Sequence, residues 1–99
     1  MRIEQLEYLV EVANCKSISL ASQNLFTTQP NVSKALKALE LELDLTLFTR
    51  EKNTIAFTEE GNTVLEYAYQ VLKQLEQLRN YALSRQTNIK KLQGSLKVG

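Results

Sequence analysis

The sequence predicts a mainly α-helical fold of three helices, a short β-hairpin and one long final helix. Apolar residues recur every three or four positions over most of the 99-residue chain, which is the period of an amphipathic helix. Proline occurs only at position 30 and glycine only at positions 61, 94 and 99, so few residues interrupt helices. After residue 50 the polar run Glu51 to Thr54 leads to Ile55, Ala56 and Phe57, where large apolar residues alternate, so we expect a hairpin over about residues 47 to 57.

The first two helices are indicated by apolar spacing and by a capping serine. One face of a helix over residues 3 to 13 carries Ile3, Leu6, Leu9, Val10 and Ala13. The pattern breaks at residues 14 to 17, and either Ser17 or Ser19 can cap a second, short helix. That helix would carry Leu20, Ala21 and Leu25.

The third helix is predicted to run from a capping threonine to about Leu43. Thr27 or Thr28 is the expected N-cap, and Pro30 fits the first turn because N–H groups there lack a partner within the helix. The stripe expected to be buried consists of Val32, Leu36 and Leu39. We expect Asp44 to end the helix, because Asp tolerates the left-handed conformation better than most residues.

The hairpin that follows is expected to carry basic residues, and the last helix to carry an apolar seam. Arg50 and Lys52 would lie on the hairpin arms and Asn53 near its tip, and Thr58 is the next expected N-cap. The seam alternates steps of four and three, as in a coiled coil, over Val64, Ala68, Val71, Leu75, Leu78 and Ala82. It could pack on the first three helices, but so long a helix extends beyond that small domain, so we expect a homodimer.

Composition excludes several functional classes. With no His and a single Cys, the chain offers almost no ligands for zinc, no internal disulfide and no His-based triad. No Gly-rich phosphate loop is present, so we expect no enzyme and no metal site. No segment is apolar enough to span a bilayer, and acids occupy the N-terminus where a signal peptide would be basic. We therefore expect a cytoplasmic protein without a membrane partner. We expect Cys15 to be a small buried or half-buried apolar residue between helices.

The third helix has a polar side on which no acid occurs. The net charge is only +1, but the chain contains no Asp or Glu from Val12 to Leu39. That side could simply be solvated surface. A short helix, a turn and a helix with such a face are, however, the arrangement of a helix-turn-helix, whose second helix enters the DNA major groove. With the hairpin as a wing, the pattern predicts a winged helix-turn-helix.

The polar residues suit contacts with DNA. Gln29 can pair with a base edge, notably adenine, while Lys34 and Lys37 can reach guanine acceptors or phosphates. The capped helix N-terminus offers free N–H groups to a phosphate. The residues expected to contact DNA are Thr28, Gln29, Pro30, Asn31, Ser33, Lys34, Lys37, Arg50, Lys52 and Asn53.

Residues 17 to 61 contain, in order, the segments SISLASQNL, TTQPNVSKALKALELELDLTLFTR and IAFTEEG. Together these segments closely resemble the DNA-binding domain of the LysR-type transcriptional regulators of bacteria. It implies that Gln29, Pro30, Ser33 and Lys34 contact bases and backbone in the major groove. The chain departs from the family pattern at Ser22, Thr28, Asp44, Asn53 and Phe57, and the missing wing Arg at position 53 weakens the expectation of a minor-groove contact there.

The resemblance also implies a division of the chain. Residues 1–58 would form the winged helix-turn-helix, with the motif at about 18–37 and the wing at about 47–57. Residues 59–89 would form the dimerisation helix, and residues 90–99 a hinge and the start of an effector-binding domain that this fragment lacks. The fragment would therefore need no cofactor, whereas the full-length protein would bind a small-molecule effector and its dimers could pair into tetramers.

The sequence thus predicts a transcription regulator that reads inverted repeats in double-stranded DNA as a homodimer, through its third helix. The alternative is a coiled-coil protein-interaction module with a winged-helix head, which the near-neutral net charge favours.

Overall fold

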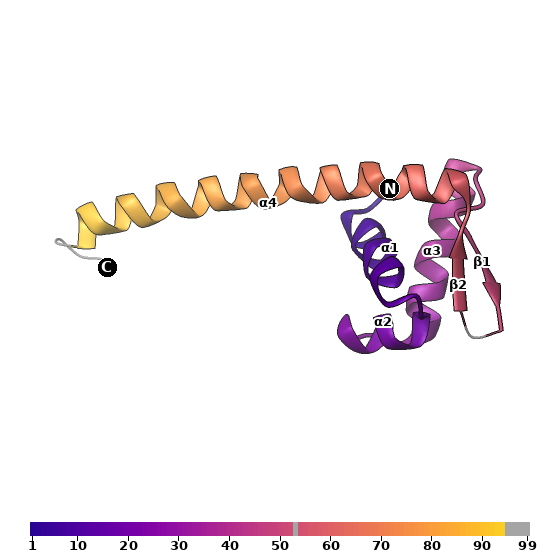
Figure 1. Ribbon diagram of the computed structural model, residues 1–99. Coiled ribbons are helices and arrows are strands. Elements are labelled where there is room, and N and C mark those ends of the chain that lie inside the picture. The colour runs from indigo at the N-terminus through magenta and orange to yellow at the C-terminus, as the bar shows by residue number, and fades with distance from the viewer. Residues whose placement is uncertain (53, 95–99) are drawn as a thin grey trace.

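The computed structural model describes the backbone of residues 1–52 and 54–94 and the side chains of residues 1–52 and 54–86. The elements follow the predicted order: α1 (Ile3–Cys15), α2 (Ile18–Asn24), α3 (Gln29–Leu43), β1 (Phe48–Glu51), β2 (Thr54–Phe57) and α4 (Glu59–Gly94). The first three helices and the hairpin form one group, and α4 passes across it and continues well beyond it (Figure 1). The predicted mainly α-helical fold with a hairpin wing is confirmed.

Hydroxyl side chains cap three helices. The Ser17 hydroxyl accepts a hydrogen bond from the Leu20 N–H at 3.1 Å. The Thr28 hydroxyl accepts from the Asn31 N–H at 3.2 Å, and the Thr58 hydroxyl from the Gly61 N–H at 2.9 Å. The caps are therefore Ser17 rather than Ser19, and Thr28 rather than Thr27. Asp44 follows α3 with a φ of 57°, so the predicted left-handed end of that helix is confirmed.

The core forms where α1, α2 and α3 meet under the start of α4. Its buried side chains are Leu6, Leu9, Val12, Ile18, Ala21, Val32, Leu36, Leu39, Leu47, Ile55 and Ala68. The predicted stripe of α3 is confirmed, but two expectations about α1 and α2 were wrong. Val12 is fully buried whereas Ile3, in the first turn of α1, is 38% exposed. In α2, the cap at Ser17 turns Ile18 and Ala21 inward, which leaves Leu20 46% exposed.

The hairpin is antiparallel, and the start of α4 closes onto its base. Phe48 pairs with Phe57, with ring centroids 5.9 Å apart, and Arg50 pairs with Ile55. Lys52 lies in the turn with a φ of 56°, not on an arm as predicted. Asn53, the expected tip, lies outside the described residues.

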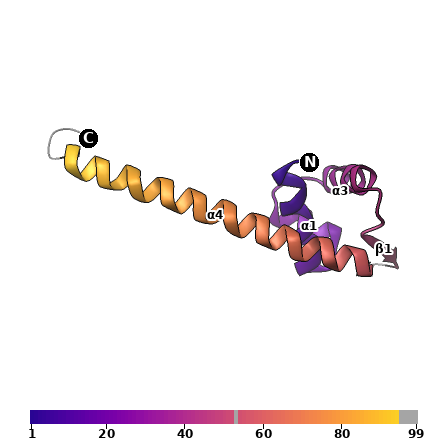
Figure 2. The ribbon, with the colours of Figure 1, turned by 90° about the horizontal axis from the view of Figure 1, so that it is seen from above.

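Only the first part of α4 packs on the domain. Ala68 is 1% exposed, and Val64, Leu65 and Leu72 are half-buried against the core. The helix continues past residue 89, where the sequence pattern predicted its end, to Gly94. Figure 2 shows this extension pointing away to one side of the domain. Residues 95–99, in the segment expected to begin an effector-binding domain, lie outside the described residues. None of the described helices is long and apolar enough to cross a membrane.

Gly61 allows the first turn of α4 to approach the loop before β1. A Cβ at this position would lie 1.8 Å from the carbonyl oxygen of Leu47. That same oxygen accepts a hydrogen bond from the Thr58 N–H at 3.0 Å. The glycine is therefore required by close backbone contact, and it fixes where α4 begins relative to the wing.

Replacing Gly61 by Ala should destabilise the fold, although alanine is normally favoured within helices. The clash with the Leu47 carbonyl should lower the free energy of unfolding by about 1–3 kcal/mol, measured by urea denaturation. Asn62→Ala, at an exposed position in the same turn, should change it by less than about 0.5 kcal/mol. Equal stability of both variants would show that the loop can move away without cost.

Candidate nucleic-acid interface

One side of α3 is exposed, polar and free of acids over its first three turns. The side chains of Gln29, Pro30, Asn31, Lys34 and Lys37 are exposed. The opposite side holds the fully buried stripe, so the direction of the polar side is fixed by packing. The N-terminal end of α3 lies beside α2 and the tip of the hairpin, at the end of the domain away from α4 (Figure 1).

Two threonines organise the start of this helix. Thr28 caps it through the Asn31 N–H, and the hydroxyl of Thr27 accepts a hydrogen bond from the Asn31 amide Nδ2 at 3.1 Å. Asn31 is therefore tied to the turn that precedes the helix. Gln29 makes no hydrogen bond with its side chain among the described residues, so its amide remains available for a ligand.

The wing is tied to α3 by a contact that sequence reasoning did not find. Arg50 Nη2 donates a hydrogen bond to Ser33 Oγ at 2.7 Å. Within the described residues Arg50 forms no ion pair. Its positive charge and its four other N–H groups are therefore available to bind an anion. Ser33 therefore serves to hold the arginine, and its hydroxyl is less free to meet a base than the sequence predicted.

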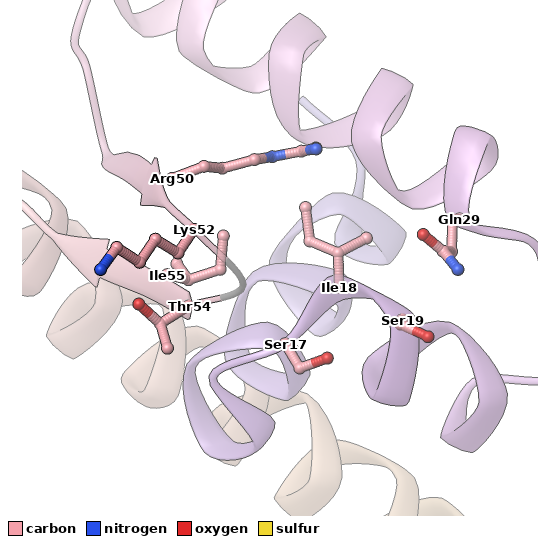
Figure 3. A pocket seen from close by; sticks show the side chains of 8 residues that line it. All are labelled: Ser17, Ile18, Ser19, Gln29, Arg50, Lys52, Thr54 and Ile55. Carbon is pink, nitrogen blue, oxygen red and sulfur yellow. The ribbon is translucent and has the colours of Figure 1, made fainter.

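A hollow of about 270 Å³ opens between α2, the start of α3 and the wing. Figure 3 shows its lining side chains: Ser17, Ile18, Ser19, Gln29, Arg50, Lys52, Thr54 and Ile55. We call it the wing hollow. Its lining has two cations and no acid, which suits a phosphate or another anion. Sequence reasoning missed Ser17, Ser19 and Thr54 as members, because only the fold brings α2 and the wing together.

The structure does not bring all predicted site residues into one place. Gln29, Arg50 and Lys52 line the wing hollow, whereas Lys34 lies with Asn31 in a separate hollow between α1 and α3. Lys37 borders a third hollow whose lining includes Glu40 and Asp44. The hollow beside Lys34 is lined by one acid, Glu4, and the hollow beside Lys37 by two, so Lys37 is the less suited of the two to a DNA contact.

Among the described residues there is neither a candidate metal site nor a reactive thiol. No group of three or more His, Cys, Asp and Glu side chains there could hold a metal ion. Cys15 is half-buried, as predicted, and its thiol donates to Glu11 Oε2 at 3.3 Å. Burial, followed by the Glu11 carboxylate, raises the pKa of this thiol, which keeps it protonated and unreactive.

Comparison with known proteins points to one family. A model described as bacterial regulatory helix-turn-helix protein, lysR family, matches residues 3–62. The "Probable RuBisCO transcriptional regulator" of Trieres chinensis is 37% identical over 75 residues, which is 76% of this chain and 24% of that regulator. The chain spans 24% to 33% of the length of three similar regulators from Bacillus subtilis.

Two solved structures of DNA complexes share the fold. The DNA-binding domain of BenM, bound to catB site 1 DNA, superposes with a TM-score of 0.83 at 27% identity, covering 89% of this chain and 95% of that one. The DNA-binding domain of CbnR, also solved with DNA, gives a TM-score of 0.81 at 27% identity over 86% of this chain and 98% of that one.

Replacing Thr28 by Ala should remove the cap of α3 and destabilise the fold. The loss of the 3.2 Å bond to the Asn31 N–H should lower the free energy of unfolding by about 0.5–2 kcal/mol, measured by urea denaturation. Thr28→Ser retains the hydroxyl and should stay within about 0.5 kcal/mol of the unaltered chain. If both variants lose the same stability, the threonine methyl group rather than the cap is responsible.

Proposed function

The chain belongs to the lysR family of bacterial regulatory helix-turn-helix proteins, and from this we propose that it is the sequence-specific DNA-binding part of a transcription regulator. The observation that carries the proposal is the acid-free, exposed N-terminal half of α3, which adjoins the cationic wing hollow. The start of α3 lies with α2 and the tip of the hairpin at the end of the domain away from α4 (Figure 1). Because residues of these elements line the hollow, a duplex could meet the helix and the hollow together.

The geometry supports distinct roles for the residues of this face. Gln29, exposed at the first position of α3, reads a base edge, with adenine as its best partner. Lys34, exposed five residues further along α3 and facing a different hollow, reaches guanine or a phosphate. Arg50 and Lys52 hold the phosphate backbone from the wing hollow. The predicted contacts of Thr28, Pro30, Asn31, Ser33, Lys37 and Asn53 belong to the same proposal.

The exposed seam of α4 supports a homodimer. Val71 is 42% and Leu78 63% exposed, and Ala82 is also exposed, while Ala68 is already buried within the chain. A second α4 would cover the outer part of this seam. A two-fold dimer reads an inverted repeat whose half-sites lie roughly 34 Å apart, about one helical turn of DNA.

The wider regulator follows from the same family membership. Residues 1–58 would bind DNA and residues 59–89 would join two copies. Since the chain spans about a quarter to a third of most of the curated relatives it matches, the rest of a full-length protein would hold the effector-binding domain. Binding of a small molecule, pairing of dimers into tetramers and a cytoplasmic location are part of the proposal.

The direct test is fluorescence anisotropy of the chain on DNA from upstream of its own gene and on a scrambled duplex, across a salt series. We expect preference for the upstream DNA and an affinity that falls steeply with salt, because phosphate contacts release counterions. Equal affinity for both duplexes would contradict sequence-specific reading. Binding to neither by the folded chain would favour the protein-interaction module.

Replacing Gln29 and Lys34 separately by Ala should separate the two kinds of DNA contact. Gln29→Ala should lose about 1–3 kcal/mol of discrimination at one base pair while the salt dependence stays unchanged. If Lys34 meets a phosphate, Lys34→Ala should weaken binding to all sequences and reduce the salt slope by about 1. The measurement is anisotropy on a set of single-base-pair variants. Uniform weakening by Gln29→Ala would contradict its base-reading role.

Replacing Leu78 by Asp should shift the chain from dimer to monomer, because a carboxylate would enter the apolar seam. We expect sedimentation velocity to show a dimer for the unaltered chain and a dissociation constant at least about tenfold higher for the variant. Asn80→Asp adds the same charge on the opposite side of α4 and should leave the dimer intact. Equal effects of both changes would indicate charge repulsion rather than loss of seam packing.

A further inference from the structure

Phe26 is the most exposed large hydrophobic side chain among the described residues. It is 95% exposed, whereas the next, Leu41, is 74% exposed. A solvated phenyl ring forgoes the free energy that burial would supply. Either the backbone must hold the ring in solvent, or a binding partner must cover it.

The backbone holds the ring outward. Phe26 lies between α2 and α3 with a φ of 56°, in the left-handed region that bulky side chains rarely adopt. The Phe26 N–H donates to the Gln23 carbonyl at 3.1 Å, and the Thr27 N–H donates to the Ser22 carbonyl at 2.9 Å. These bonds fix the turn on both sides of Phe26.

The turn also joins the ring to the DNA-facing end of α3. Phe26 is two residues before the cap Thr28, and the hydroxyl of its neighbour Thr27 is bonded to Asn31 in the first turn of that helix. The backbone of Phe26 is therefore held in place relative to the start of α3. If this end of α3 enters the major groove, Phe26 is carried to the DNA with it.

The chemistry around the ring favours DNA over a protein partner. No acid occurs between residues 12 and 39, and the neighbours Asn24, Thr27 and Thr28 are polar and uncharged. The nearest acid established by a contact is Glu11, whose carboxylate accepts a hydrogen bond from Asn24 Nδ2 at 2.8 Å. A protein-binding site is typically a wider apolar patch, whereas Phe26 is a single ring among polar groups. The major groove presents one apolar group, the C5-methyl of thymine, which a phenyl ring can contact.

We propose that Phe26 is a specificity-determining residue that packs its ring on a thymine methyl group in the major groove, at the edge of the site read by α3. This inference rests on the proposed DNA-binding function. It adds an apolar contact to the polar contacts of Gln29 and Lys34, and it accounts for a strained, solvated aromatic residue at the start of the recognition helix.

The test compares four proteins on two duplexes by fluorescence anisotropy. The proteins are the unaltered chain, Phe26→Ala, Phe26→Gly and Leu41→Ala, the last removing an exposed apolar side chain at the other end of α3. The duplexes are the preferred upstream DNA and the same DNA with deoxyuridine in place of every thymidine, which lacks the methyl groups.

We expect Phe26→Ala to weaken binding to the thymine duplex about three- to tenfold without altering the salt dependence, because the ring is neutral. The unaltered chain should lose more affinity on the uracil duplex than Phe26→Ala does. Phe26→Gly should weaken binding equally, yet be no less stable to urea than the unaltered chain, since glycine suits the left-handed turn. Leu41→Ala should behave as the unaltered chain on both duplexes.

Equal affinities of Phe26→Ala and the unaltered chain for the thymine duplex would overturn this inference alone. Equal losses of both proteins on the uracil duplex would overturn the thymine assignment. Failure of the unaltered chain to bind either duplex would instead overturn the proposed function, and this inference with it.

Discussion

The burial of Val32, Leu36 and Leu39 decides which side of α3 faces water, and the rest of the interface depends on it. All three side chains are fully buried against α1 and α2. Because they occupy one stripe of the helix, the exposed residues on the other side cannot rotate inward without emptying the core. The orientation of the polar face is thus a consequence of packing.

Two further contacts extend this orientation to the wing and to α4. The 2.7 Å bond from Arg50 to Ser33 ties the hairpin to the N-terminal half of α3. The close approach of Gly61 to the Leu47 carbonyl ties the start of α4 to the base of the same hairpin. The recognition helix α3, the hairpin and the start of α4 are therefore held in fixed positions relative to one another. Pairing of two α4 helices would then also set the distance between two recognition helices.

Local rules of helix formation made much of the fold predictable from the sequence. Capping by threonine, the end of α3 at Asp44 and the stripe of α3 depend on residues a few positions apart, and all are as predicted. Features that depend on packing between elements were harder to predict from the sequence. The sequence could not decide between Ser17 and Ser19 as a cap, and this choice determines that Ile18 rather than Leu20 is buried.

In the candidate site, too, features set by local spacing were predictable and features set by packing between elements were not. The polar side of α3 follows from helical spacing, but the wing hollow joins residues from α2, α3 and the hairpin, which no local pattern relates. The exposure of Phe26 depends on carbonyl groups of Ser22 and Gln23 that hold its turn, and an apolar residue read from sequence alone would be assigned to the core. The acids beside Lys37, by contrast, follow from helical spacing, because Glu40 and Asp44 come three and seven residues after it.

The most direct test of the account is amide chemical-shift mapping by NMR of the chain, free and with the DNA that it prefers. The account predicts that the largest changes fall in residues 27–34 and in the hairpin, with the part of α4 beyond residue 72 little affected. Changes confined to α4, or spread evenly over the surface, would contradict the assignment of the N-terminal half of α3 and the wing as the DNA-binding face.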